Sequence, residues 1–168
     1  MALNAYLTLT GQKQAKIKGS VTQKGREDSI MVIAVSHSIT SPRDSASGLP
    51  TGKRQHGQFT ITKELDKSSP LLYSALVNNE NITQWELKFY TPQVRATSGV
   101  GSEVNHYTIR LTNANIASIN FTMPNNKDPN LTKFAEYEEV AFTYQKIEWV
   151  WTDGGITADD DWETPRGD

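Results

Sequence analysis

Apolar and polar residues alternate with a period of two along most of the chain, which is typical of strands with one buried and one solvated face. The segment from Ile30 to Val35 is apolar at both parities, so we expect a strand that is covered on both sides, by the core and by the helix or a neighbouring chain. The pattern predicts a mainly β fold. The inward-facing sets that it predicts are Leu3, Ala5, Leu7 and Leu9; Trp85, Leu87 and Phe89; Tyr107, Ile109 and Leu111; and Ile119, Phe121 and Met123.

The last long strand changes phase in its middle. One parity holds Val140, Phe142 and Tyr144, whereas the other holds Ile147, Trp149 and Trp151. Both sets can face inward if a β-bulge inserts a residue near Gln145-Lys146, or if the strand bends there into a second sheet. The pattern leaves both alternatives open, and either device helps to close a barrel or a tight sandwich.

One segment predicts a short helix that follows a strand. The strand has an apolar face formed by Phe59 and Ile61, and the helix begins at Ser69-Pro70. Ser69 can cap this helix, and Pro70 suits its first turn, where a missing N–H costs nothing. We expect the apolar stripe of the helix to consist of Leu71, Leu72, Ala75 and Leu76.

Composition limits the class of protein. The chain has 168 residues, 36% of them hydrophobic, a net charge of −2 and no cysteine. We expect one domain over residues 1–152 with an acidic tail over 153–168, no nucleic-acid partner and no thiol chemistry. No apolar run approaches the roughly 20 residues that span a bilayer, and the first residues do not resemble a signal peptide. We therefore expect a protein made in the cytoplasm and not inserted in a membrane.

A long polar segment, residues 41–55, interrupts the strands and carries Arg43, Asp44, Lys53 and Arg54. Segments of this length inside compact domains are usually functional or disordered. We expect it to make contacts between subunits or between rings through these charged residues, and not to be needed for the fold. The acidic residues 159–161 of a neighbour offer one partner of opposite charge.

Residues that could carry chemistry are present, but their spacing does not support a site. His37, His56 and His106 fall on separate segments without a second ligand at metal-site spacing. Glu64 and Asp66 lie at a strand-to-helix junction, where Asp66 is better explained by a turn or by the helix N-terminus. No phosphate loop, EF-hand or nucleophile motif occurs. We expect no catalysis, no cofactor and no metal.

The four tryptophans raise an alternative function, a carbohydrate-binding β-sandwich with an exposed aromatic platform. Trp85 and Trp149 have the inward parity of good strands, so we expect them in the core. Trp162 lies in the tail, where we expect it to be exposed. An enzyme that uses a histidine or Glu64 is a third hypothesis.

Three segments resemble the haemolysin-coregulated protein (Hcp) family, which forms the inner tube of the type VI secretion system. They are HGQFTITKELDKSSPLLYSAL at 56–76, YQKIEWVW at 144–151 and GGITADDDW at 154–162. The resemblance implies a compact β-barrel of two sheets with one short flanking helix. It also implies a structural, non-catalytic subunit of stacked hexameric rings, exported from the bacterial cytoplasm without a cleaved signal peptide. The implied partners are other copies of the chain, a spike at the tube tip, a contractile sheath and effectors carried in the ring lumen.

The resemblance also suggests which strand face borders the lumen. On the segment 30–36, the side chains of Val32, Ala34 and Ser36 are smaller than those of Met31, Ile33 and Val35. Small side chains leave room for cargo, so we expect the face with Val32, Ala34 and Ser36 to line the lumen and the other face to fill the core.

Overall fold

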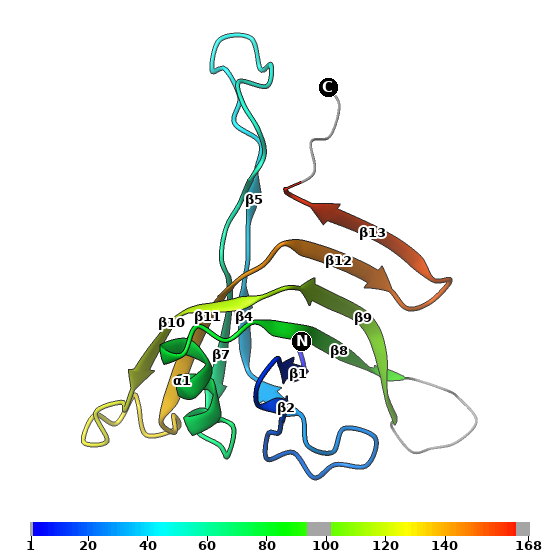
Figure 1. Ribbon diagram of the computed structural model, residues 1–168. Helices are drawn as coiled ribbons and strands as arrows, with labels where there is room; N and C mark the ends of the chain where they lie inside the picture. Colours follow the sequence, from blue (N-terminus) through cyan, green and yellow to red (C-terminus); the bar gives the residue numbers. More distant parts are fainter. Residues whose placement is uncertain (1, 94–101, 164–168) are drawn as a thin grey trace.

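The computed structural model describes residues 2–93 and 102–163, which form two main antiparallel sheets, a two-stranded ribbon and one helix (Figure 1). The larger sheet has seven strands in the order β13-β12-β9-β8-β1-β2, with β3 paired to the other part of β1. These strands are β1 (Ala5–Gly11), β2 (Ala15–Ile17), β3 (Ile30–Val32), β8 (Ile82–Gln93), β9 (Ser102–Thr112), β12 (Lys146–Trp151) and β13 (Ile156–Asp161).

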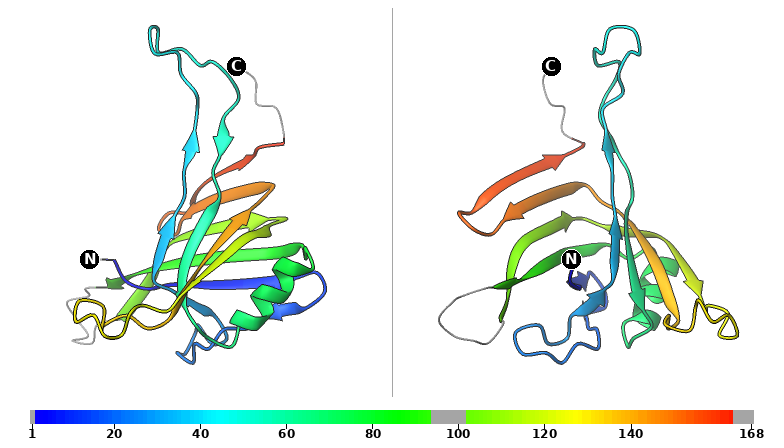
Figure 2. Two further views of the ribbon diagram at one scale, coloured as in Figure 1. Left: turned by 90° about the vertical axis from the view of Figure 1, so that its left-hand side faces the viewer. Right: turned by 180° about the vertical axis from the view of Figure 1, so that it is seen from behind.

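The smaller sheet has four strands in the order β10-β11-β7-β4. They are β4 (Ala34–Ser36), β7 (Phe59–Glu64), β10 (Asn115–Thr122) and β11 (Tyr137–Thr143). The ribbon pairs β5 (Ile39–Thr40) with β6 (Gln55–His56) and projects away from the body of the molecule (Figure 2).

The hydrophobic core lies between the inner faces of the two sheets. Leu7, Leu9 and Leu87 of the larger sheet and Phe59, Ile61 and Val140 of the smaller one are all buried. Trp85 joins the two layers, because its ring makes edge contacts with Phe59 and Phe142 at centroid distances of 5.0 and 5.5 Å. The alternation of buried and solvated residues predicted for β1, β8 and β9 is confirmed. Each fully buried large apolar side chain contributes about 1.5–3 kcal/mol to the stability of the fold.

Helix α1 (Ser69–Val77) packs against β10 beside the smaller sheet. The predicted cap is wrong by one residue, because Ser68 is the N-cap and the hydroxyl of Ser69 hydrogen-bonds Glu138 instead. Leu72 and Ala75 are buried as predicted, whereas Leu71 lies at the surface. Asp66 accepts a hydrogen bond from the Ser68 N–H at 2.9 Å, so it forms the turn before the helix.

Over residues 2–93 and 102–163, the chain bends directly from one sheet into the other at three strand pairs, β3–β4, β9–β10 and β11–β12. The phase change near Gln145 is such a bend, because β11 belongs to the smaller sheet and β12 pairs with β9 and β13 in the larger one. The strand expected over 30–35 is likewise divided at Ile33 into β3 and β4, which lie in different sheets. Ile33 and Val35 are exposed in the single chain, so the helix does not cover this segment, and its cover by a neighbouring chain stays a prediction.

The mainly β class with one short helix is confirmed, but the sheets do not close into a barrel. In the described residues, β4 and β10 form the edges of the smaller sheet and β13 forms one edge of the larger. Two expectations need correction here. The tail after Asp153 includes the strand β13. Phe121, which lies on the core side of β10, and Met123, which follows the strand, are 52% and 61% exposed and therefore not buried as expected.

Candidate functional site

The outer face of the smaller sheet, which we call the polar face, carries small and hydroxyl side chains. Residues that lie directly opposite each other on neighbouring strands point to the same face of the sheet. The core side of the sheet contains the row Val35, Ile61, Val140 and Ile119, so the residues between them point outward. The polar face is formed by Ala34 and Ser36 of β4, Thr60, Thr62 and Glu64 of β7, Ser118, Asn120 and Thr122 of β10, and Tyr137, Glu139, Ala141 and Thr143 of β11.

The structure separates the three residues expected to line a lumen. Ala34 and Ser36 are exposed on the polar face. Val32 is 1% exposed and pairs with Ala5 in the larger sheet, so it belongs to the core and lines no lumen. The physical reason is the bend at Ile33, because it moves the side chains before and after it into different sheets.

The polar segment at 41–55 is an ordered two-stranded hairpin, and we call residues 38–57 the arm. Its strands are held by backbone hydrogen bonds from Gly57 N to Ser38 O at 2.8 Å and from Asp44 N to Leu49 O at 2.8 Å. The Asp44 carboxylate accepts from Ser47 Oγ at 2.7 Å, and this hydrogen bond holds the pKa of Asp44 below its usual range. Leu49, at the tip, is 64% exposed.

The charged residues of the arm do not act together. Arg43 takes part in a backbone bridge with Pro50 near the tip, and Lys53 is exposed. Arg54 lies near the arm's base, where its Nη2 donates to Asp160 Oδ1 at 2.9 Å. The expected charge attraction between arm and acidic tail is therefore made within one chain. Hydrogen bonding by Arg54 holds the pKa of Asp160 below its usual range, despite partial burial.

An apolar groove of about 610 Å³ lies at the other end of the molecule from the arm tip, under the connection between β10 and β11. It meets the polar face at Ala34, Thr62, Thr122 and Tyr137. Its apolar lining includes Ile33, Met123, Leu131 and Phe134. Three of these side chains, Ile33, Met123 and Phe134, are exposed, so the groove is an apolar surface suited to contact with another protein.

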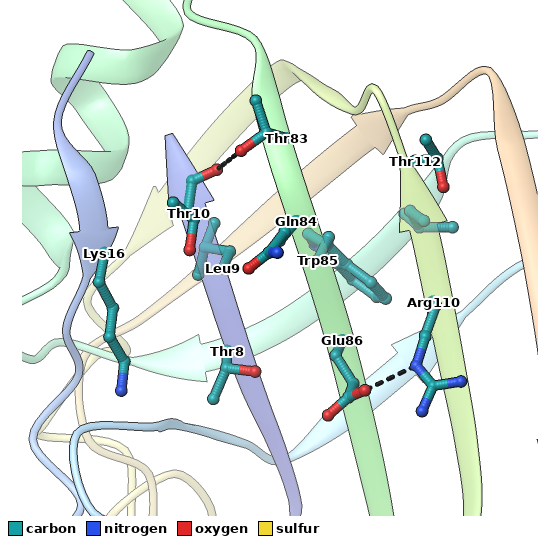
Figure 3. Close-up of a pocket in the computed structure, with 11 residues that line it drawn as sticks. Thr8, Leu9, Thr10, Lys16, Thr83, Gln84, Trp85, Glu86, Arg110 and Thr112 are labelled. Carbon is teal, nitrogen blue, oxygen red and sulfur yellow. Dashed lines mark hydrogen bonds and ion pairs between the residues drawn. The ribbon is translucent and has the colours of Figure 1, made fainter. Parts of the chain in front are cut away.

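A second groove, of about 530 Å³, lies on the larger sheet (Figure 3). Polar residues dominate its lining, among them Thr8, Thr10, Thr83 and Gln84. Arg110 lies between two carboxylates on neighbouring strands and donates to Glu86 and Glu148, at 2.7 Å in each case. Partial burial raises the pKa of Glu86, but the hydrogen bonds and positive charges of Arg110 and Lys88 together outweigh it and leave this pKa lowered. The charges of Glu86 and Arg110 thus compensate each other across the groove.

The candidate catalytic residues lack the geometry of an active site. Among the described residues, no three His, Cys, Asp or Glu side chains converge as metal ligands. Glu64 is exposed on the polar face, and Asp66 lies 3.1 Å from the buried Lys63 ammonium. Trp85 is buried and Trp162 is exposed, as predicted, while Trp151 is also exposed. In the described part of the chain, no helix has the length and apolarity required to cross a membrane.

Sequence reasoning missed one cluster at the base of the arm. His37 and His56, which were treated as separate, both contact the hydroxyl of Tyr144 at 2.7 Å. No motif spacing signals this arrangement, because Tyr144 lies 107 residues after His37 and 88 after His56. They meet only in the folded chain, where the base of the arm lies beside the bend between β11 and β12.

Comparisons with known proteins agree with one another. Residues 6–151 match the family described as "Type VI secretion system effector, Hcp". The chain is 40% identical to the "Major exported protein" of Pseudomonas aeruginosa strain PAO1 over 174 aligned positions, which cover 98% of each chain.

Solved structures give the same result. A mutant of Hcp1 from the E. coli EAEC 042 pathovar superposes with a TM-score of 0.82 at 35% identity, over 96% of this chain and 99% of that one. A crystal structure of an Hcp protein gives 0.85 at 32% identity, over 96% and 99%. Hcp3 of Pseudomonas aeruginosa gives 0.73 at 32% identity with the same coverage. With a polar outer sheet face, a projecting arm and no catalytic constellation in the described residues, the chain belongs to the Hcp family of the type VI secretion system.

Proposed function

We propose that this Hcp chain, a tube subunit of the type VI secretion system, forms hexameric rings whose lumen is lined by the polar face. The observation that carries the proposal is the contrast between the two sides of the smaller sheet. One side is core, and the other presents small hydroxyl and amide side chains, including Ser36, Thr60, Thr62 and Asn120. Such a wall remains hydrated and leaves space beside Ala34 and Ser36 for a passing polypeptide.

Ring formation requires head-to-tail contacts that close after six copies. Each contact must bury on the order of 800 Å² per partner to be stable. Stacking of rings is supported by the positions of the arm and the apolar groove at opposite ends of the molecule (Figure 1). In a stack, the arm tips with Leu49 and the neighbouring charges Arg43, Asp44 and Lys53 meet the groove ends of the next ring.

Export is supported by the Pseudomonas relative, which is described as a major exported protein. The chain is made in the cytoplasm, leaves without a cleaved signal peptide, and acts with a spike, a contractile sheath and effectors carried in the lumen. It has no catalytic activity and needs no cofactor. These roles follow from family membership and from the absence of a converging catalytic or metal cluster in the described residues.

Native mass spectrometry at micromolar concentration tests the ring. We expect a species of six chains that persists at moderate salt. A monomer throughout the salt range would refute the proposal.

The lumen assignment has a separate test. Ser36→Gln adds bulk to the polar face, so it should leave the hexamer intact and reduce the amount of effector that copurifies with it. Thr112→Gln, an equally exposed threonine on the larger sheet, is the matched control and should retain the effector. Equal retention by the two variants contradicts the assignment of the polar face to the lumen.

A further inference from the structure

Four side chains from four segments form a continuous hydrogen-bonded chain at the base of the arm, which we call the arm-base chain. His37 Nε2 and His56 Nδ1 each lie 2.7 Å from the Tyr144 hydroxyl oxygen, and His56 Nε2 lies 2.8 Å from Asp160 Oδ2. His37 follows β4, His56 ends β6, Tyr144 lies at the bend after β11, and Asp160 is in β13. The arm-base chain therefore connects both strands of the arm to the two sheets.

The charge of Asp160 fixes the direction of every hydrogen bond in the arm-base chain when both histidines are neutral. An ionised carboxylate only accepts, so His56 Nε2 must carry a hydrogen. The Nδ1 of neutral His56 then accepts from the Tyr144 hydroxyl, whose oxygen accepts in turn from His37 Nε2–H. All four groups are satisfied in this one arrangement.

One added proton can be accommodated without breaking the arm-base chain. If His56 becomes charged, its Nδ1–H donates to the Tyr144 oxygen, and the tyrosine hydroxyl donates to His37 once that ring adopts its other tautomer. A second proton cannot be accommodated. Two imidazolium rings would both donate to one oxygen, the tyrosine hydrogen would lose its acceptor, and two positive charges would share a largely buried site.

The groups that surround the arm-base chain oppose this second charge. Burial, and then the nearby His56, lower the pKa of His37. Burial raises the pKa of Tyr144, so its hydroxyl stays protonated. Arg54 donates to Asp160 and, at 3.0 Å, to the main-chain oxygen of Asp161. Arg54 thus already compensates the carboxylate that His56 faces.

The rings are also packed against apolar groups. His37 lies against Phe59 at a centroid distance of 5.0 Å, and His56 against Trp162 at 6.3 Å. The Trp162 indole N–H donates to the main-chain oxygen of Tyr144. The side chain of His56 is 4% exposed, so water offers little solvation to an added charge.

We propose that the arm-base chain is a pH-sensitive latch, which holds the arm against β13 while its two histidines share at most one proton and releases it when both are charged. The sign follows from proton linkage. The open state binds a proton on His37 more tightly than the latched state, so stability of the latch falls as the pH drops below the ordinary histidine value of about 6.5. This property goes beyond tube assembly, since it concerns how one chain holds its own arm.

Hydrogen exchange followed by mass spectrometry tests the latch in the assembled full-length protein. After correction for the intrinsic pH dependence of amide exchange, exchange in the segments 37–40, 54–57 and 156–162 should rise by about tenfold or more between about pH 7.5 and about pH 5. Each proton required for opening contributes up to a factor of ten per pH unit. Exchange in β8 and β9 should stay unchanged over the same interval.

Variants separate a latch from a simple structural contact. His37→Gln with His56→Gln should abolish the pH-dependent step, whereas His106→Gln, which replaces the third histidine, should retain it. Nitrogen-15 shifts of the imidazole rings at about pH 7.5 should report both His37 and His56 as Nε2–H tautomers.

Three results overturn the proposal. The first is hydrogen exchange in the wild type that does not depend on pH. The second is a rise in exchange at low pH that β8 and β9 share. The third is a pH-dependent increase in exchange that persists in the double variant of His37 and His56. If that variant does not fold by circular dichroism, the wild-type profile and the ring tautomers decide the question.

Discussion

Replacing Lys63 by methionine should destabilise the fold strongly, because Lys63 is a fully buried ammonium beside the start of α1. Its Nζ donates to Glu138 Oε1 at 2.5 Å and to Ser69 Oγ at 3.0 Å, and it lies 3.1 Å from Asp66 Oδ1. Three ammonium donors thus have three partners. Methionine keeps most of the apolar stem of the side chain but leaves two carboxylates, one of them completely buried, without their cation.

The magnitude follows from the burial of both partners. Lys63 and Glu138 are both 0% exposed, and removal of one member of such a pair costs about 3–5 kcal/mol. In a chain of this length each kcal/mol lowers Tm by about 2–4 °C, so the expected fall is roughly 6–20 °C. After the replacement, the Ser69 hydroxyl still donates to Glu138 Oε1 at 2.7 Å, but Glu138 Oε2 has no hydrogen-bond partner among the described residues and no cation compensates the charge.

Urea-induced unfolding measures the effect, with Lys146→Met as the matched control. Lys146 pairs with Asp159 at 3.1 Å at the surface, where such pairs contribute about 0–1 kcal/mol. The double variant Lys63→Met with Glu138→Leu should recover most of the loss, because the uncompensated charge is removed. A Lys63→Met protein within about 1 kcal/mol of the wild type would refute the reasoning, as would a double variant no more stable than the single one.

Three further predictions concern the arm, a tight backbone contact and metal dependence. Replacing residues 43–50 by a two-residue turn spares Arg54 and the core, so far-UV circular dichroism and Tm should be nearly unchanged. Electron microscopy of this variant should show loss of tubes. Tubes of normal length would exclude the arm from stacking. Gly19→Ala should cost about 1–3 kcal/mol in urea unfolding, because a Cβ there would lie 2.2 Å from the Ser29 carbonyl oxygen, whereas Gly52→Ala meets no atom within 4 Å and should be neutral. Chelator treatment should leave Tm unchanged, since no metal cluster occurs among the described residues; a fall that one metal ion reverses would contradict this.

The parts of the fold that the sequence predicted are those in which one face of a strand is buried by its own chain. Leu7, Leu9 and Leu87 follow this rule, and so does the phase change near Gln145, because a strand that enters a second sheet must change the parity of its buried residues. Phe121 breaks the rule. Its apolar parity is regular, yet its side chain is exposed beyond the reach of this chain's own core.

The interactions that the sequence did not predict depend on partners that are distant along the chain. A lysine such as Lys63 is usually at the surface, and its burial requires Glu138, which lies 75 residues away. The arm is ordered by backbone hydrogen bonds, which leave no side-chain pattern. The expected lumen face failed at Val32 because a bend at one residue, Ile33, reassigns the side chains on either side of it.

The three bends, at Ile33, between β9 and β10 and near Gln145, also affect how the subunit responds to mechanical load. Two sheets that were joined only by side-chain packing could be peeled apart along their apolar interface. Here the chain continues from one sheet into the other at all three places, so a force that separates the sheets acts on covalent backbone. Separation of the sheets therefore requires the backbone at these bends to extend or rearrange, in addition to the loss of the apolar contacts between them.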